Sequence, residues 1–73
     1  MKNIYLLKDL ARISGQSTYT IKFYLKLGLL EEIGRSPETN YRYFDESTLA
    51  RLKVIRQLRA EGVSLKDIKK RLG

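Results

Sequence analysis

Three side chains that can hydrogen-bond or carry a positive charge recur at helical spacing in the first third of the chain. Thr18, Tyr19 and Lys22 stand at positions i, i+1 and i+4, so a helix would place them on one face. Hydroxyl groups can bond to base edges in the major groove of DNA, whereas an ammonium group neutralises a phosphate. We therefore predict that Thr18 and Tyr19 contact bases and that Lys22, together with Tyr24, binds phosphate.

A second set of basic and aromatic side chains has the pattern of a β-hairpin, in which Arg35, Tyr41 and Arg42 are the candidates for DNA contact. Side chains alternate along a strand, so Tyr41 and Tyr43 would share one face. Arg42 would lie on the opposite face with Phe44, which is predicted to be core. This leaves Arg42 at the rim of the sheet, free to reach a phosphate or the minor groove. The alternative is an ordinary solvated arginine.

The end of the chain carries a third basic group within an amphipathic helical pattern. Its cationic members are Lys66, Lys69, Lys70 and Arg71. Lysines opposite an apolar face are usually only solvated, and this alternative stays open here. The predicted DNA contact is Lys66, the most N-terminal of the four.

A helix-turn-helix would position the first set of residues. Apolar spacing predicts a first helix over about 7–13, and Gly15 ends it because glycine readily takes the left-handed conformation of a helix C-terminus. Ser17 is a favoured N-cap for a second helix, which ends at Gly28. Two helices joined by a short glycine-containing turn form the helix-turn-helix pattern, here over about 7–27.

Three residues of the second helix are expected to pack against the rest of the domain. Phe23 and Leu25 are predicted to be core. The ring of Tyr24 is also predicted to be core, while its hydroxyl reaches outward.

The rest of the chain predicts a wing and a helical scaffold. Strand-forming residues flank the turn Pro37–Asn40, which indicates a two-stranded hairpin over about 33–44. Such a hairpin is marginal by itself and must pack on helices. Asp45 and Ser64 are the predicted N-caps of two scaffold helices within about 46–72. The predicted fold is mainly α, with four short helices and the wing between the second and the third.

Composition favours a nucleic-acid partner. The chain has 73 residues, which is one domain, and carries 15 Lys and Arg against 8 Asp and Glu, with neither His nor Cys. Its net charge of +7 attracts polyanions. Without thiols and imidazoles the usual nucleophiles, general bases and zinc ligands are missing, so we predict no enzyme, metal or cofactor.

Apolar runs in the chain stay well short of the about 20 residues that span a bilayer. The N-terminus lacks the apolar region and cleavage site of a signal peptide. We expect a cytoplasmic, nucleoid-associated protein without a membrane partner.

Three motifs stand in a fixed order along the chain. They are Thr20–Tyr24 followed by Leu27–Leu30, then Asn40–Phe44, and finally Gly62–Ile68. Together they resemble the MerR family of transcription regulators, whose members carry Thr-Ile-Arg-Tyr-Tyr-Glu with Gly-Leu-Leu, a Gly-Tyr-Arg-x-Tyr wing and Gly-x-Ser-Leu-x-x-Ile. The resemblance covers nearly the whole chain, from about Ile4 to Leu72.

The resemblance implies a winged helix-turn-helix with its second helix in the major groove and its wing on the flanking backbone or minor groove. Carried over by position, it implies phosphate contacts by Lys22, Tyr24 and Arg42, with Thr18 and Tyr19 facing the groove. The partners it implies are double-stranded DNA, RNA polymerase at a promoter, and a second copy of the chain on DNA.

Several positions depart from the family pattern and mark an atypical member. Lys22 stands where the family usually has Arg, so a point charge replaces a bidentate group. Leu25 replaces Glu, and Gln16 replaces an apolar residue. Asn40 replaces the wing Gly, but Asn tolerates the left-handed conformation.

Family members typically continue into a long coiled-coil helix and an effector domain, whereas this sequence stops at Gly73. We expect the DNA-binding part of a longer regulator, or a short protein that binds as a monomer or cooperatively along repeated sites. Two other functions stay open at this point. One is an excisionase-like architectural factor that bends DNA for a phage or mobile element. The other is a basic protein-interaction module with no affinity for DNA at physiological salt.

Overall fold

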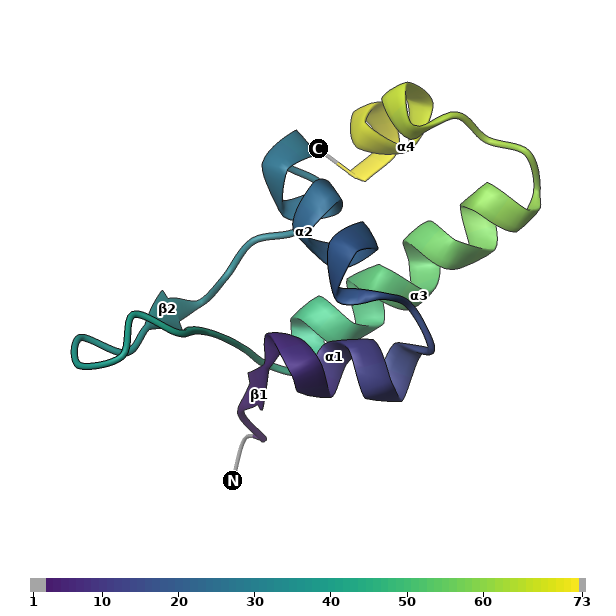
Figure 1. The fold of residues 1–73 in the computed structure, drawn as a ribbon. Helices are drawn as coiled ribbons and strands as arrows, with labels where there is room; N and C mark the ends of the chain where they lie inside the picture. Colours follow the sequence, from purple (N-terminus) through teal and green to yellow (C-terminus); the bar gives the residue numbers. More distant parts are fainter. Residues whose placement is uncertain (1–2, 73) are drawn as a thin grey trace.

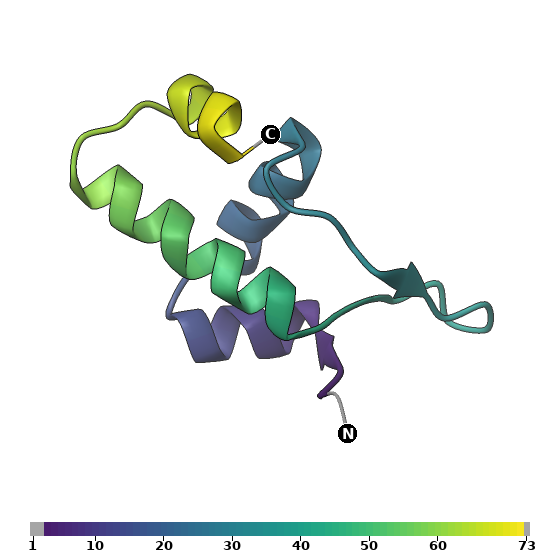
Figure 2. The ribbon, with the colours of Figure 1, turned by 180° about the vertical axis from the view of Figure 1, so that it is seen from behind.

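The computed structural model describes residues 3–72 and contains four helices within that range, as predicted. In chain order the elements are β1 (Tyr5–Leu6), α1 (Leu7–Ser14), α2 (Thr18–Leu27), β2 (Gly34–Arg35), β3 (Arg42–Phe44), α3 (Glu46–Ala60) and α4 (Leu65–Leu72). Figure 1 shows the helices gathered into one body and the hairpin of β2 and β3 extending away from it. Figure 2, the view from behind, shows the same hairpin extending away from the helices.

Side-chain caps and glycine turns set the ends of the helices. The Ser17 hydroxyl accepts a hydrogen bond at 3.1 Å from the N–H three residues later, where α2 begins. The Asp45 carboxylate caps α3 by accepting from the N–H two residues later at 2.9 Å, and the Ser64 hydroxyl caps α4 by accepting from the N–H three residues later at 3.2 Å. Gly15 and Gly28 follow α1 and α2 with φ of 75° and 81°, a conformation that glycine adopts at little steric cost. The two helices and the turn between them extend from Leu7 to Leu27.

The sheet has three strands where the sequence predicted two. β1 pairs antiparallel with β3, which also pairs with β2, so the strand order is β1-β3-β2. The Asp9 carboxylate accepts a hydrogen bond from the Leu6 N–H at 2.9 Å and ends the strand where α1 begins. The Tyr5 hydroxyl donates to Glu46 at 2.6 Å and ties β1 to the start of α3. β1 is two residues long, too short for a strand periodicity to reveal it.

The core lies where the helices meet the inner end of the sheet. Its buried members are Leu10, Ile21, Tyr24, Leu29, Leu30, Phe44, Leu49, Leu52, Ile55 and Ile68. Phe44 is fully buried, as predicted, and joins β3 to the helices. The Tyr24 ring is core as well, with 7% of the residue exposed.

Two arginines of α3 bind backbone carbonyl groups near the ends of the other helices. Arg51 Nε donates to the carbonyl of Leu29, just after α2, at 2.6 Å, and Arg51 Nη2 donates to Leu72 at 3.3 Å. Arg56 donates to the carbonyl of Ser14, the last residue of α1, at 2.9 Å. A cation is favourable at a helix C-terminus, because the free carbonyl groups carry partial negative charge. These contacts hold α1, α2 and α4 on α3.

The wing is closely packed where Tyr43 crosses Gly34. The two residues are directly paired in the sheet, and the Tyr43 ring occupies the space that a Cβ atom at Gly34 would need. The constraint on Gly34 is one of space, because its φ is not in the left-handed region.

Replacing Gly34 by Ala should lower the free energy of unfolding by about 1–3 kcal/mol, the usual cost of overpacking. Urea unfolding of the wild type and the variant measures the difference. In a Tyr43→Ala background the same change should cost less than about 0.5 kcal/mol, because the ring is gone. An equal cost in both backgrounds would show that another contact sets the constraint.

Candidate nucleic-acid interface

The solvent-facing side of α2 has two edges with different chemistry. Thr18, Lys22 and Lys26 form the edge that faces the wing. Tyr19 is 79% exposed and Phe23 is 40% exposed, and both lie further round the helix. The polar and cationic edge suits phosphate and base edges, whereas the aromatic edge suits apolar groups such as the thymine methyl.

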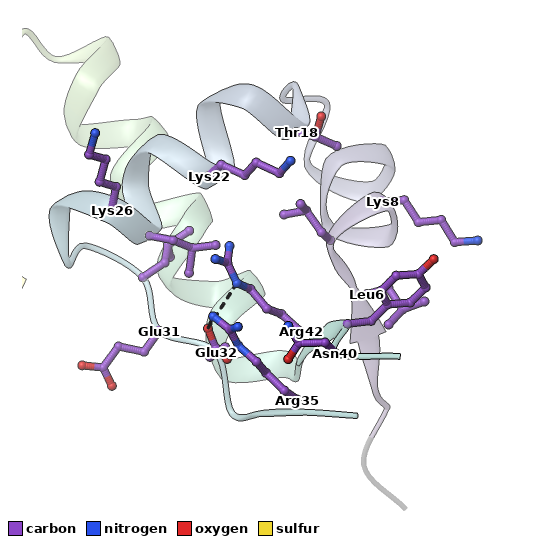
Figure 3. A pocket seen from close by; sticks show the side chains of 14 residues that line it. Leu6, Lys8, Thr18, Lys22, Lys26, Glu31, Glu32, Arg35, Asn40 and Arg42 are labelled. Atoms are coloured by element: carbon purple, nitrogen blue, oxygen red, sulfur yellow. Dashed lines mark hydrogen bonds and ion pairs between the residues drawn. The ribbon is translucent and has the colours of Figure 1, made fainter. Parts of the chain in front are cut away.

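A groove of about 1330 Å³ lies between α2, the start of α1 and the wing. Figure 3 shows its charged side chains arranged around the opening. Its basic members are Lys8, Lys22, Lys26, Arg35 and Arg42, and its acidic members are Glu31 and Glu32. Tyr41 and Asn40, which has a φ of 60°, lie on the wing side. The excess of positive charge gives this groove an electrostatic potential that suits a polyanion.

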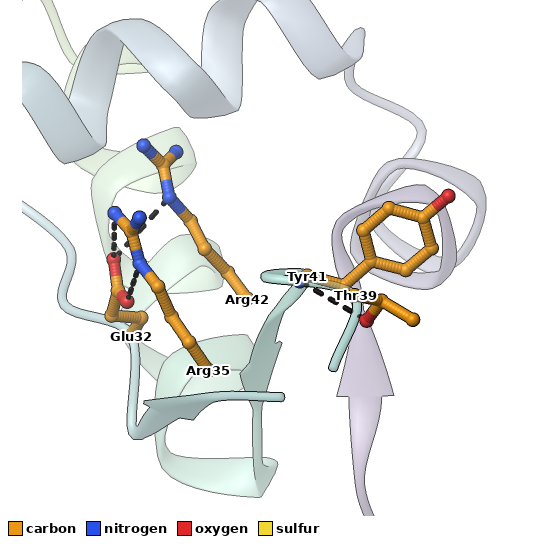
Figure 4. A network of polar contacts seen from close by, with 5 residues as sticks. All are labelled: Glu32, Arg35, Thr39, Tyr41 and Arg42. Carbon is orange, nitrogen blue, oxygen red and sulfur yellow. Dashed lines mark hydrogen bonds and ion pairs between the residues drawn. The ribbon is translucent and has the colours of Figure 1, made fainter. Parts of the chain in front are cut away.

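Glu32 binds both arginines of the wing. Arg35 donates to it through Nε at 2.6 Å and through Nη2 at 3.2 Å, a bidentate arrangement. Arg42 Nε lies 3.3 Å from Glu32 Oε1, the same oxygen that accepts from Arg35 Nη2. In Figure 4, dashed lines join this one carboxylate to both guanidinium groups. The predicted freedom of Arg42 is therefore corrected: it lies at the rim, with 35% of its side chain exposed, but it is paired.

The ion pairs shift the protonation equilibria of their members. The hydrogen bonds from Arg35 hold the pKa of Glu32 below its ordinary value, and attraction to Arg42 adds to the effect. The same hydrogen bonds raise the pKa of the Arg35 guanidinium. Because the folded-state pKa of Glu32 is depressed, its pairing stabilises the fold above the unfolded-state pKa and is lost as pH falls through the folded value.

The other predicted contact residues divide into groups. Thr18, Lys22, Arg35, Tyr41 and Arg42 come together around the groove. Tyr19 lies beside this set on the outer surface of α2, and Tyr24 lies beneath it in the core. Lys66 is outside the groove, in a small hollow of about 200 Å³ between α4 and the end of α2.

Phe23 and Glu32 differ from what the sequence predicted. Phe23 was predicted to be core, but it is exposed because Ile21, Tyr24 and Leu25 already supply the inward face of α2. Glu32 carried no signal as a site residue. Its spacing of three from Arg35 resembles a helical ion pair, but the segment is a loop, where that spacing has no fixed geometry.

Residues 3–72 offer no grouping of three or more metal-ligating side chains. Within the same part of the chain, none of the helices has the length and apolar character that crossing a membrane requires.

A helix-turn-helix with a wing beside its second helix and a basic groove between them defines the winged helix-turn-helix class. The sequence matches the family described as MerR HTH family regulatory protein over residues 5–73. The chain belongs to this family.

Curated relatives and solved structures agree with this assignment. The chain is 41% identical over 68 residues to the HTH-type transcriptional regulator CueR of Bacillus subtilis, covering 93% of this chain and 46% of the relative. It is 36% identical over 69 residues to the HTH-type transcriptional regulator ZntR of Escherichia coli, covering 94% of this chain and 48% of the relative. The chain thus spans about half the length of these relatives.

Among solved structures, the chain is similar to HiNmlR, described as a MerR family regulator lacking the sensor domain, bound to promoter DNA. The TM-score is 0.83 at 38% identity, covering 93% of this chain and 51% of that one. It is also similar to the HTH-type transcriptional regulator SkgA from Caulobacter crescentus, with a TM-score of 0.84 at 36% identity, covering 96% of this chain and 50% of that one.

Replacing Arg35 by Gln should raise the midpoint of the Glu32 carboxyl titration, because the largest contribution that lowers this pKa is lost. Carbon-detected NMR during an acid titration follows the carboxyl signal directly. Arg59→Gln, at the far end of α3, serves as the control and should leave the midpoint unchanged. If Arg35→Gln leaves it unchanged as well, the bidentate pair does not exist in solution.

Proposed function

We propose that this chain binds double-stranded promoter DNA as the DNA-binding domain of a MerR-like transcription regulator. The observation that carries the proposal is the basic groove that joins α2 to the wing. The likeness to HiNmlR, which is described as bound to promoter DNA, supports it. The relatives are regulators, which favours this function over an excisionase-like factor, a protein-interaction module or an enzyme.

In the proposed complex α2 enters the major groove. Thr18 and Tyr19 at its N-terminal end contact base edges, and Lys22 binds phosphate. The exposed ring of Phe23 adds an apolar contact that the sequence did not predict. Tyr24 is held by the core, so its contribution is restricted to its hydroxyl group.

In this proposal the wing binds the flanking DNA backbone or the minor groove. Arg42 binds phosphate, and Arg35 and Tyr41 lie beside it on the same groove. Lys66 is exposed at the start of α4 and supplies a separate phosphate contact beyond the end of α2. Contacts on both sides of α2 would fix its position along the duplex.

The proposal also covers the domain boundaries, the partners on DNA and the location of the protein. Residues 1–73 form one domain, with its helix-turn-helix over about 7–27, its wing over about 33–44 and its scaffold over about 46–72. Two copies associate on DNA at a promoter, where RNA polymerase is a further partner. The protein acts in the cytoplasm, on the nucleoid. The basis for these points is the chain's membership of the MerR HTH family.

Replacing Arg42 by Ala should weaken binding to all duplex sequences about equally. The slope of log affinity against log salt should fall by about 0.9, the contribution of one neutralised phosphate. Fluorescence anisotropy at several salt concentrations measures both quantities. Lys53→Ala removes the same charge from α3, outside the groove, and should keep the wild-type slope. If the two variants behave alike, the wing does not contact DNA.

Replacing Tyr19 by Ala should change which sequences are preferred, because this residue is assigned to base edges and not to phosphate. Selection from random duplexes, followed by footprinting, compares the sites of the wild type and the variant. The symmetry of the wild-type site also reports how many copies bind. Identical enriched sequences for both proteins would remove Tyr19 from base recognition.

A further inference from the structure

A carboxylate just before the wing binds the two wing arginines that the proposed function places at the DNA backbone. Glu32 accepts from Arg35 through two nitrogens and lies 3.3 Å from Arg42 Nε. Phosphate groups are bound by arginine through the same fork of nitrogens. In the free protein, Glu32 therefore engages Arg35 Nε, Arg35 Nη2 and Arg42 Nε, three of the guanidinium nitrogens with which the wing would bind DNA.

We propose that Glu32 is an autoinhibitory residue of the DNA site, which a backbone phosphate must displace from Arg35 and Arg42. This inference rests on the proposed function. It assigns to Glu32 the role of lowering the affinity for DNA, in contrast to the basic side chains around it. The affinity of the wing for DNA is then set by a competition between the Glu32 carboxylate and a DNA phosphate for the same two arginines.

The geometry allows the exchange. The side chains of Glu32, Arg35 and Arg42 are 29%, 44% and 35% exposed, and exposed ion pairs are weak because water and salt screen them. Arg35 Nη2 and Arg42 Nε share Oε1 of Glu32, whereas Oε2 accepts from Arg35 Nε alone, so the carboxylate gives Arg42 no oxygen of its own. Figure 3 shows the guanidinium of Arg42 extending from the wing toward α2, in the direction of the groove.

Two effects make Glu32 inhibitory. Its contacts with Arg35 Nε, Arg35 Nη2 and Arg42 Nε must be broken before these nitrogens can bind phosphate. After that, the freed carboxylate remains in the groove beside the phosphate and repels it. A positioning role would have the opposite consequence. If Glu32 held the arginines in their binding orientation throughout, its loss would weaken the complex.

The chain offers a matched control in the neighbouring residue. Glu31 lines the same groove and carries the same charge, but it forms no ion pair with any residue between 3 and 72. Glu31→Gln therefore changes the net charge as Glu32→Gln does, without releasing the arginines. Both residues lie in a loop at the surface, and thermal unfolding checks that both variants remain folded.

The test measures the affinity of the wild type, Glu32→Gln and Glu31→Gln for a fluorescein-labelled duplex of mixed sequence at several salt concentrations. Glu32→Gln should bind about three- to tenfold more tightly than the wild type at low salt, and the gain should shrink as salt rises. Glu31→Gln should gain less than about twofold. Glu32→Ala, which removes the acceptor atoms altogether, should gain at least as much as Glu32→Gln.

Equal gains for the two glutamine variants would reduce the effect to net charge and overturn the proposal. Weaker binding by Glu32→Gln would overturn it in favour of a positioning role. In both cases the wild type still binds DNA, so the proposed function stands. A wild type without affinity for DNA would instead overturn the proposed function and this inference together.

A direct readout of the exchange is the Glu32 carboxyl carbon signal by NMR. When unlabelled duplex is added to the wild type, this signal should move from its paired position to that of a glutamate free of arginine. A signal that stays at its paired position in the saturated complex would show that Glu32 keeps its partners, and would overturn the proposal.

Discussion

The burial of Phe44 is the contact on which the geometry of the site depends. Its ring is fully buried among the helices, and its backbone pairs with Tyr5 of β1. Because side chains alternate along a strand, Arg42 lies on the same side as Phe44 and reaches the groove toward α2. A slip of one residue in β3 would bring Tyr43 to that side instead. An apolar contact in the core thus decides where a charge of the wing lies.

Local chemistry explains what could be predicted from the sequence. Ser17, Asp45 and Ser64 each accept a hydrogen bond from the helix they begin, and the two glycines after α1 and α2 have the left-handed conformation expected of them. These features depend on residues only a few positions apart. Which side chains gather around the groove could also be predicted, because residues on one face of a helix or a strand recur with a fixed period.

The unpredicted features depend on how side chains and elements pack in three dimensions, which no periodic pattern in the sequence describes. β1 exists because Tyr5 pairs with Phe44 and its hydroxyl donates to Glu46, about forty residues later. Phe23 is exposed because the core is already filled by its neighbours on α2. Glu32 meets Arg42 across the sheet edge, and no periodicity in a loop could indicate that contact. Helix and strand patterns describe single elements, whereas these three outcomes were decided by how the elements pack.

A net charge of +7 favours binding to a polyanion, but the basic side chains differ in whether they are already paired within the protein. Lys22 and Lys26 line the groove without an ion pair to residues 3–72, whereas both wing arginines share one carboxylate. Under the proposed function, the unpaired lysines of α2 would bind DNA directly. The wing arginines would bind only after a DNA phosphate has replaced the Glu32 carboxylate. The salt dependence of binding then reports two kinds of contact, because releasing counterions from DNA and breaking an internal pair respond differently to ionic strength. Counting basic residues alone would overestimate the affinity of such a site.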